Sequence, residues 1–342
     1  MQQEKGGAYA GPGKDEFDRS GQETKLASHV NDNPKNFQYT RFVAQLSLLS
    51  FSLRGGGTPT MIIDCHTHIF PPSMRDNRGP LIKADPAFRL LYNSAKAKLV
   101  GAAALIEQMD RSQVDRTVVF GFPWHDPEPM RRHNDYVGEA ASRFPDRLLP
   151  FVCVDPKVAQ AAEEVERCLA TGMRGVGELA FYTEVLDSRV VGVLEPIASS
   201  CRQHGVPLMI HTNERVGHWY PGKSEASLKV IYEIVRAFPQ NRFILCHWGG
   251  GLFFYELLKK EAGEVLSQVA YDTAASPFLY DPQIYDIAVK IVGAQRILFG
   301  SDYPLILPER YFEEMAAAGL SEEDQAWIKG RSASKWLDLE DN

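Results

Sequence analysis

From Met61 onward, short apolar runs alternate with longer stretches in which apolar residues recur every three or four positions. The runs are rich in Val, Ile and Leu, which is typical of strands buried in a parallel sheet. The stretches between them have the spacing of amphipathic helices, and several end near Gly, Asn or a Phe-Pro pair. Eight such runs begin at residues 61, 116, 148, 173, 206, 242, 267 and 296.

This alternation predicts an α/β fold, the eight-stranded parallel (β/α)8 TIM barrel, which typically takes about 250 residues. The alternative is a doubly wound open sheet, which would need a glycine-rich phosphate-binding turn after an early strand. The first strand ends instead in His66-Thr67-His68. The stretch from Ile69 to about Leu99 is long for a connection between a strand and a helix, so we expect a lid over the barrel mouth.

Residues 1–60 differ in composition from the rest of the chain. They are rich in Gly, Gln, Asn, Asp, Ser and Lys, lack a sustained period and finish in a run of glycines. This predicts a disordered N-terminal extension ahead of a catalytic barrel domain at residues 61–342. Because Met61 opens the first strand, the extension is either a regulatory tail or a non-native addition before the true start. Its longest apolar stretch, Arg41–Leu53, is too short to span a bilayer and too far from Met1 for a signal peptide.

The composition of the 342-residue chain narrows the class of partner. With 44% hydrophobic and 24% charged residues, the chain can bury a large core. Its 37 basic and 44 acidic side chains give a formal charge of -7, the wrong sign for binding nucleic acid. The 5 cysteines include no close pair, so neither a disulfide framework nor a thiolate zinc cluster is indicated. We therefore expect a cytoplasmic protein that binds a small-molecule substrate and no membrane, and homo-oligomer formation stays open.

The first expected strand carries a candidate pair of metal ligands. His66 and His68 are two positions apart, so on a strand their side chains point to the same side and can chelate one ion. Neutral imidazole nitrogens suit zinc, iron, manganese or cobalt. Alone, the pair could equally be two polar residues in a turn.

Polar residues also stand at the carboxyl ends of five other expected strands. These ends meet at one face of a barrel, the face that carries active sites, whereas structural polar residues would be scattered over both ends. Unpaired charges are expensive to bury, so such a group of carboxylates and imidazoles indicates a cation among them. The residues are Glu178, His211, His247, Asp272 and Asp302.

Several motifs around these residues occur together and are specific as a set. They are MIIDCHTHIF at 61, HNDYVGEAASRFPDRLLPFVCVDP at 133, GVGELAFY at 175, IHTNE at 210, ILCHWGG at 244 and LFGSDYP at 298. From Met61 to about Trp336 the sequence therefore resembles the amidohydrolase superfamily, in its amidohydrolase-related branch of metal-dependent hydrolases and decarboxylases.

The resemblance implies a divalent metal ion, expected to be zinc, with one or two ions per chain. Some superfamily members bind a second ion through a carboxylated lysine or a glutamate on the fourth strand. This sequence has Glu178 at that place, which permits two ions. The ligands implied for the first ion are His66, His68, His211 and Asp302.

Two further roles follow for the candidate catalytic residues Asp302 and His247. A carboxylate that touches both a metal and its bound water can take a proton, so we expect Asp302 to act as general base. The resemblance implies that His247 polarises the substrate or moves a proton; the alternative is a histidine bonded to a neighbouring strand. Asp272 either orients a metal ligand or caps the next helix.

The loops offer candidate substrate contacts. His218, Tyr220 and Lys223 follow the fifth strand, and Trp124 follows the second. Aromatic and cationic groups there suit a planar or carboxylated ligand, although such a run is also typical of an exposed turn. Two arginines of the expected lid, Arg75 and Arg78, could clamp a carboxylate or be solvated surface.

Three functions are compatible with these residues. The first is hydrolysis of an amide, ester, lactone or related bond by metal-activated water. The alternative is non-oxidative decarboxylation of an aromatic or unsaturated acid, which an arginine near the metal-bound acid would favour, whereas two ions bridged by Glu178 would favour the hydrolase. The third is a non-catalytic binding barrel, which Asp302 argues against because a binder needs no base.

Overall fold

The apolar runs form eight parallel strands, paired in the order in which they occur in the sequence. The computed structural model describes residues 61–182, 187–224 and 227–339, all within the unit Pro59–Asn342. The predicted barrel is therefore confirmed, whereas the predicted disorder of residues 1–60 lies outside the described residues. The strands are β1 (Ile63–His68), β2 (Arg116–Phe120), β3 (Leu148–Val152), β4 (Gly175–Leu179), β5 (Leu208–Ile210), β6 (Phe243–Leu245), β7 (Val269–Asp272) and β8 (Ile297–Leu298).

The barrel closes between the segment that follows β8 and the first strand. The amide of Cys65 donates to the carbonyl of Phe299 at 2.7 Å, and the amide of His68 donates to the carbonyl of Tyr303 at 2.9 Å. The motif LFGSDYP, which begins at the end of β8, therefore runs alongside β1. This places Asp302 next to the strand that carries His66 and His68.

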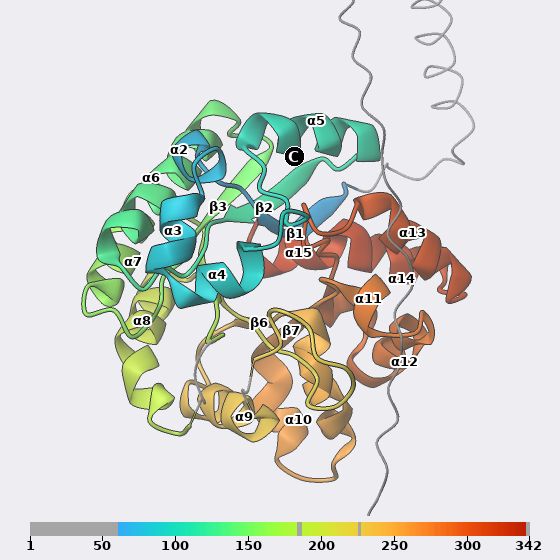
Figure 1. Ribbon diagram of the computed structural model, residues 1–342. Coiled ribbons are helices and arrows are strands. Elements are labelled where there is room, and N and C mark those ends of the chain that lie inside the picture. Colours follow the sequence, from blue (N-terminus) through green and yellow to red (C-terminus); the bar gives the residue numbers. More distant parts are fainter. Residues whose placement is uncertain (1–60, 183–186, 225–226, 340–342) are drawn as a thin grey trace, which may run out of the picture. The chain divides into compact units, whose positions relative to one another are not determined.

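Helices surround the strands (Figure 1). Those between consecutive strands bury one face; in α9 the buried side chains are Val230, Ile231, Ile234 and Val235, the spacing of a single helical stripe. The long helices are α5 (Ala102–Ser112), α6 (Pro127–Arg143), α7 (Ala161–Ala170), α8 (Val190–His204), α9 (Leu228–Ala237), α12 (Gln283–Val292) and α13 (Pro308–Ala317). Shorter ones are α2 (Pro72–Arg75), α3 (Gly79–Ala84), α4 (Pro86–Tyr92), α10 (Ala262–Val265), α11 (Ser276–Leu279), α14 (Glu322–Ala326) and α15 (Ser332–Trp336).

The apolar core has two layers. One lies between the strands and the helices, and the other fills the barrel interior with side chains such as Val118, Phe151 and Met209. Gly175 is required by this inner layer, because a Cβ there would lie 2.3 Å from the ring of Phe151. The interior is therefore packed, and the candidate ligands stand at or next to the carboxyl ends of the strands.

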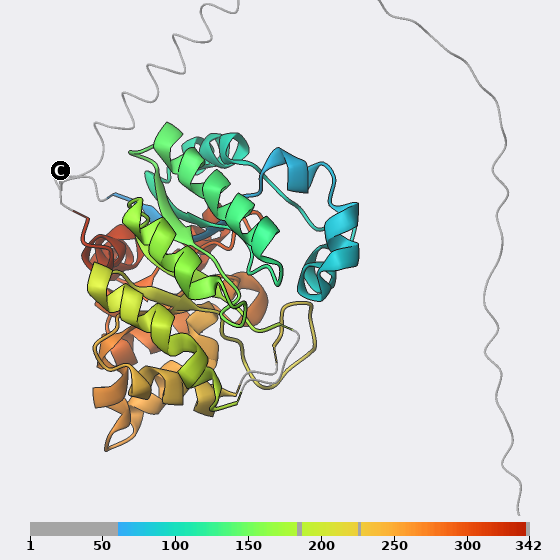
Figure 2. The ribbon, with the colours of Figure 1, turned by 90° about the vertical axis from the view of Figure 1, so that its left-hand side faces the viewer.

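The expected lid, Ile69 to Leu99, contains the three short helices α2, α3 and α4. Its base is closed by the amide of Phe70, which donates to the carbonyl of Val100 at 2.7 Å. Asp85 caps α4 by accepting the amide of Phe88 at 2.9 Å. Figure 2 shows these helices and the connection between β5 and α9 projecting from the same side of the barrel.

Candidate metal centre

His66 is the most enclosed member of the polar group at the barrel mouth. Its side chain is fully buried, and Nδ1 lies 2.8 Å from Oδ2 of Asp272. The other nitrogen, Nε2, has no hydrogen-bond partner; it lies 3.8 Å from Glu178 Oε2 and 3.7 Å from Asp302 Oδ1. Burial by itself lowers the pKa of His66, but the carboxylates of Asp272 and Glu178 outweigh it and raise that pKa to about 10. The surroundings of Nε2 thus favour a positive charge.

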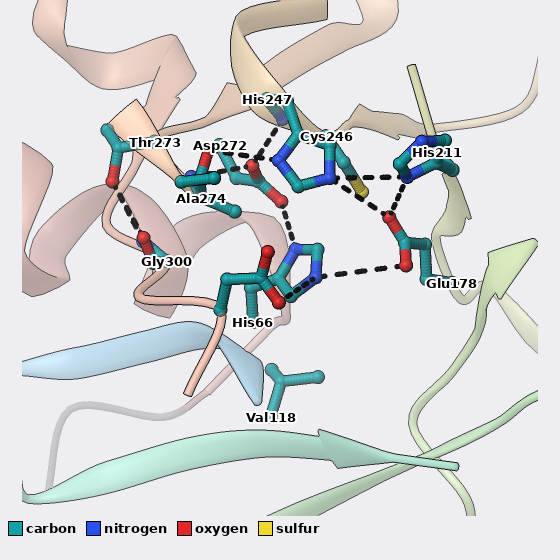
Figure 3. A network of polar contacts seen from close by, with 12 residues as sticks. His66, Val118, Glu178, His211, Cys246, His247, Asp272, Thr273, Ala274 and Gly300 are labelled. Atoms are coloured by element: carbon teal, nitrogen blue, oxygen red, sulfur yellow. Dashed lines mark hydrogen bonds and ion pairs between the residues drawn. The ribbon is translucent and has the colours of Figure 1, made fainter. Parts of the chain in front are cut away.

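Asp272 fixes the orientation of His66. Its Oδ1 accepts the amides of His247 at 2.8 Å and Ala274 at 3.0 Å, while Oδ2 faces the His66 ring. A carboxylate on one ring nitrogen of a histidine directs the other nitrogen toward a metal. Of the two roles left open for Asp272, its contact with His66 favours the orienting one, as Figure 3 illustrates.

Glu178, His211 and His247 form the opposite side of the group (Figure 3). Glu178 Oε1 lies 2.8 Å from His211 Nδ1 and 3.4 Å from His247 Nε2, and the two ring nitrogens are 3.2 Å apart. Burial tends to raise the pKa of Glu178, but His211 and His66 hold it well below its usual range. Burial lowers the pKa of His247, and its contact with Glu178 overcomes this and raises it to about 9.

A left-handed turn brings His247 into this position. Residues 247–251 all have positive φ, from 54° at His247 to 91° at Gly251. Glycine adopts this conformation readily, which accounts for the three glycines of the motif HWGGG. His247 Nδ1 lies 2.9 Å from the carbonyl of Ala274, so the ring is held on one side and free to face Glu178 on the other.

Asp302 and His68 complete the group on the side of the closing seam. His68 Nε2 lies 3.4 Å from Asp302 Oδ1, and His68 Nδ1 lies 3.1 Å from the carbonyl of Gly121. Burial alone would raise the pKa of Asp302, but the hydrogen bond from His68 and the charge of His66 lower it to about 2. Two residues before Asp302, Gly300 leaves space that a side chain would take, since a Cβ there would lie 2.8 Å from the Cβ of His66.

The predicted residues therefore come together, and their donor atoms can hold a divalent ion. Among the described residues, four sets of three donors lie with all atoms within 4.8 Å of one another in each set, and three of these sets together include every metal and catalytic residue expected from the sequence. These three sets are His66, His68 and Glu178; His66, His247 and Asp302; and Glu178, His211 and His247.

A cavity of about 600 Å³ leads from the surface to this group. Its floor carries five of the polar residues, and its wall is mostly apolar and aromatic. A second hollow of about 610 Å³, against α7 and α8, is lined by none of the candidate ligands. Apolar wall residues include Leu91, Tyr92, Phe122, Tyr182, Phe278 and Leu305, and the floor residues are His68, Glu178, His211, His247 and Asp302.

Two of the four expected substrate contacts, His218 and Tyr220, line this cavity. The hydroxyl of Tyr220 donates to Glu214 at 2.9 Å, which fixes the ring within its own loop.

Trp124 and Lys223, the other two expected substrate contacts, are not among the described residues that line the cavity. Trp124 is buried, packs against Phe88 and donates from Nε1 to His133 Nδ1 at 3.0 Å. Lys223 points back into its loop, where Nζ lies 2.9 Å from Glu214 Oε1 and donates to two backbone carbonyls. Both are bracing residues, because their polar atoms are already used within the protein.

Several wall residues were missed in the sequence. Tyr92 and Tyr182 contact the cavity, and Lys96 and Lys98 stand on its rim. Tyr182 lies three residues beyond the end of β4, a loop position of the kind that carries binding residues in barrels, so its place was a usable signal. The lid residues carry no such signal, since helix spacing does not say which face of an inserted helix meets a cavity.

The fold and the site define a barrel enzyme with a candidate metal centre at the carboxyl ends of its strands. A sequence model described as amidohydrolase matches residues 63–339, so the chain belongs to this amidohydrolase family. Among the described residues, every helix is too short or too polar to cross a membrane.

Similar proteins include several decarboxylases. The 2-amino-3-carboxymuconate-6-semialdehyde decarboxylase of Dictyostelium discoideum is 23% identical over 82% of this chain and 92% of its own length. The crystal structure of 5-carboxyvanillate decarboxylase LigW from Sphingomonas paucimobilis is 15% identical, with a TM-score of 0.67 over 82% of this chain and all of that one. The 5-carboxyvanillate decarboxylase of Novosphingobium aromaticivorans, solved with manganese and a nitrobenzoic acid, is 17% identical, with a TM-score of 0.65 over 83% and 98% of the two chains. At these identities the structures show the fold.

Proposed function

We propose that the chain is a metal-dependent, non-oxidative decarboxylase of an aromatic or unsaturated carboxylic acid. The three relatives named above are decarboxylases, and one was solved with manganese. The sequence alone placed hydrolysis first and decarboxylation second, and the relatives favour the second of these functions. Retention of an acid–base residue, Asp302, at the cavity floor supports catalysis over simple binding.

The observation that carries the metal requirement is the unpartnered Nε2 of His66. A buried nitrogen that faces two carboxylates, with its opposite nitrogen held by Asp272, has the environment of a metal ligand. We propose that His66, His68, His211 and Asp302 hold the ion, with Glu178 beside them. Imidazole and carboxylate donors suit zinc and manganese alike; zinc was the expectation from the sequence, and the Novosphingobium relative contains manganese.

A bound divalent cation would supply positive charge that binds the substrate carboxylate and offsets negative charge developing in the reaction. The aromatic wall, including Tyr92, Phe122 and Tyr182, suits a planar unsaturated body above that carboxylate. Phe122 and Tyr182, which both line the cavity, are stacked with 12° between their rings.

Decarboxylation needs a proton at the carbon that loses CO2. The proton forms a new C–H bond at that carbon. The electrons of the breaking C–C bond then return to the unsaturated system as CO2 departs, so one proton is consumed per turnover. We assign this transfer to Asp302, because its carboxyl group lies on the cavity floor, 3.4 Å from His68 Nε2, where it could relay a proton to the substrate. His247, which favours its protonated form, would donate a hydrogen bond to a substrate oxygen.

Hydrolysis is the second candidate, favoured by the place of Glu178. This carboxylate lies between His66 and His211, 3.8 Å and 2.8 Å from their ring nitrogens. It could therefore bridge two ions, as in the hydrolases of the superfamily that the sequence resembles.

The two candidates are separated by one experiment on the metal-loaded protein. Protein reconstituted with manganese or zinc is incubated in D2O with a panel of hydroxybenzoates and unsaturated diacids, and in parallel with esters, lactones and amides. The proposal expects CO2 release with one deuterium at the carbon that carried the carboxyl group, and loss of both on metal removal. Turnover of the esters or lactones without CO2 release from any acid would overturn it.

A further inference from the structure

The charged side chains of the cavity wall are separated into two regions. The carboxylates that line the cavity are Glu178 and Asp302, and both belong to the candidate metal centre. Among the described lining residues the lysines are Lys96 and Lys98, both from the lid, and there is no arginine. The lining carboxylates thus gather at the floor, and the lining lysines stand at the rim.

The rim lysines stand on a fixed backbone. The amide of Ala97 donates to the carbonyl of Ser94 at 3.0 Å, which makes residues 94–97 a turn. Arg78 Nη1 donates to the carbonyl of Ala97 at 3.0 Å and so ties this turn to the start of α3. Leu91, Tyr92, Ser94 and Ala97 line the cavity beside the lysines, so the whole stretch faces it.

The ammonium groups of Lys96 and Lys98 are free of ion pairs and hydrogen bonds to the residues that the structure describes. Other cations near the mouth are already committed. Arg75 pairs with Asp76 at 2.8 Å, Arg78 braces the turn, and Lys223 pairs with Glu214. Lysines are often solvated surface, but among the described residues these two are the unpaired lysines of a wall that is mostly apolar and aromatic.

We propose that Lys96 and Lys98 form an anion subsite that selects substrates with a second negatively charged group, at the end away from the candidate metal centre. This rests on the proposed function, because it assumes that a substrate carboxylate occupies the floor. Apart from histidines, Lys96 and Lys98 are the cationic side chains among the described lining residues that a negative group on the far end of a substrate could contact. A carboxylate or a phosphate would satisfy the subsite equally, and matched ligands distinguish them.

The test measures ligand binding and turnover with the full-length, manganese-loaded protein. The probes are 2-hydroxybenzoate, the same acid with a second carboxylate at ring position 3, 4 or 5, and the corresponding ring phosphates. The variants are Lys96→Met, Lys98→Met and the double variant, which keep the aliphatic stems, and Lys96→Arg, which keeps the charge. Lys83→Met is the matched control, because Lys83 is an exposed lid lysine that does not line the cavity.

Solvent-exposed charge contacts are modest, so we expect each single Met variant to raise the Kd of the preferred dianionic ligand about two- to fivefold, and the double variant about tenfold. The Kd of 2-hydroxybenzoate should change less than about twofold, and high salt should reduce the difference between the two ligands. Lys96→Arg and the Lys83 control should behave as the unmodified protein. For any dianionic acid that turns over, the Met variants should raise KM more than they change kcat.

Equal losses for monoanionic and dianionic ligands, or no loss in the double variant, would overturn the subsite. Calorimetric binding is independent of turnover, so the two proposals fail separately. A protein that binds the dianion through these lysines but releases no CO2 keeps the subsite and loses the decarboxylase function. A protein that releases CO2 but binds the monoanionic and the dianionic acid equally well keeps the decarboxylase function and loses the subsite.

Discussion

Replacing Asp272 by Asn should weaken metal binding without removing a proposed ligand. Asp272 accepts three hydrogen bonds, two from the amides of His247 and Ala274 and one from Nδ1 of His66. An asparagine oxygen can keep both amides, but its NH2 group then faces His66 Nδ1. Because two donors cannot pair, His66 must move its proton to Nε2, the atom that faces Glu178 and Asp302. In the reverse orientation the amide oxygen would keep the hydrogen bond from His66, but the NH2 group would face the two backbone amides and both of those hydrogen bonds would be lost.

Losing such a carboxylate partner typically lowers metal affinity by 10- to 100-fold, about 1.4–2.7 kcal/mol. We therefore expect the manganese Kd of Asp272→Asn to rise by that factor in a titration against a competing chelator dye. The gain in thermal stability on adding metal should shrink accordingly. Asp85→Asn is the control, since it also removes a buried carboxylate but leaves the centre untouched. An unchanged Kd in a folded Asp272→Asn protein would refute the orienting role.

Three further predictions test separate parts of the molecule. Asp302→Asn should retain much of the metal but lower kcat by about 100-fold or more, whereas His66→Ala should lose metal first; near-normal turnover of a metal-replete Asn variant would leave Asp302 as a ligand only. Deleting residues 1–60 should leave turnover and solubility nearly unchanged if, as we propose, 61–342 is the catalytic domain, and aggregation of the shortened protein would contradict this. His125 lies 3.4 Å from Asp85 and 3.6 Å from Asp155, and the hydrogen bond to Asp85 raises its pKa. Its stabilising effect should therefore be present below pH about 6.5 and be lost as the pH rises through the raised value, by less than about 1 kcal/mol because the ring is partly exposed. Urea unfolding of the unmodified protein and His125→Gln from pH 5.5 to 9 should converge at high pH, and parallel curves would count against the contact.

The barrel and the meeting of its strand ends were predictable because both follow from the spacing of apolar residues along the sequence. Alternating strand and helix patterns fix which residues stand at the carboxyl ends, so Glu178, His211 and Asp302 could be brought together before any coordinates. The orientation of each side chain was not predictable. Asp272 stood at such an end too, yet only its 2.8 Å contact with His66 showed that it orients a ring.

Trp124 and Lys223 lie away from the cavity for a common physical reason. Trp124 and Lys223 were chosen by residue type and nearness to a strand end, but neither property says where a side chain points in irregular backbone. Trp124 turned inward because Phe88 and His133 offer it apolar contact and a hydrogen-bond acceptor. Lys223 turned back because Glu214 and two carbonyls of its own loop satisfy its charge.

Metal site and substrate wall therefore depend on different parts of the chain. The candidate ligands stand on or next to strands, where packing on both faces allows few alternatives. Much of the wall comes from the lid, where Leu91, Tyr92, Lys96 and Lys98 contact the cavity and none of them lies on a strand. Substitutions in residues 91–98 should accordingly change which acid is accepted while metal affinity stays the same, and the Asp272 variant should do the opposite. If lid substitutions changed metal affinity as strongly as substrate preference, the wall and the centre would have to be treated as one unit.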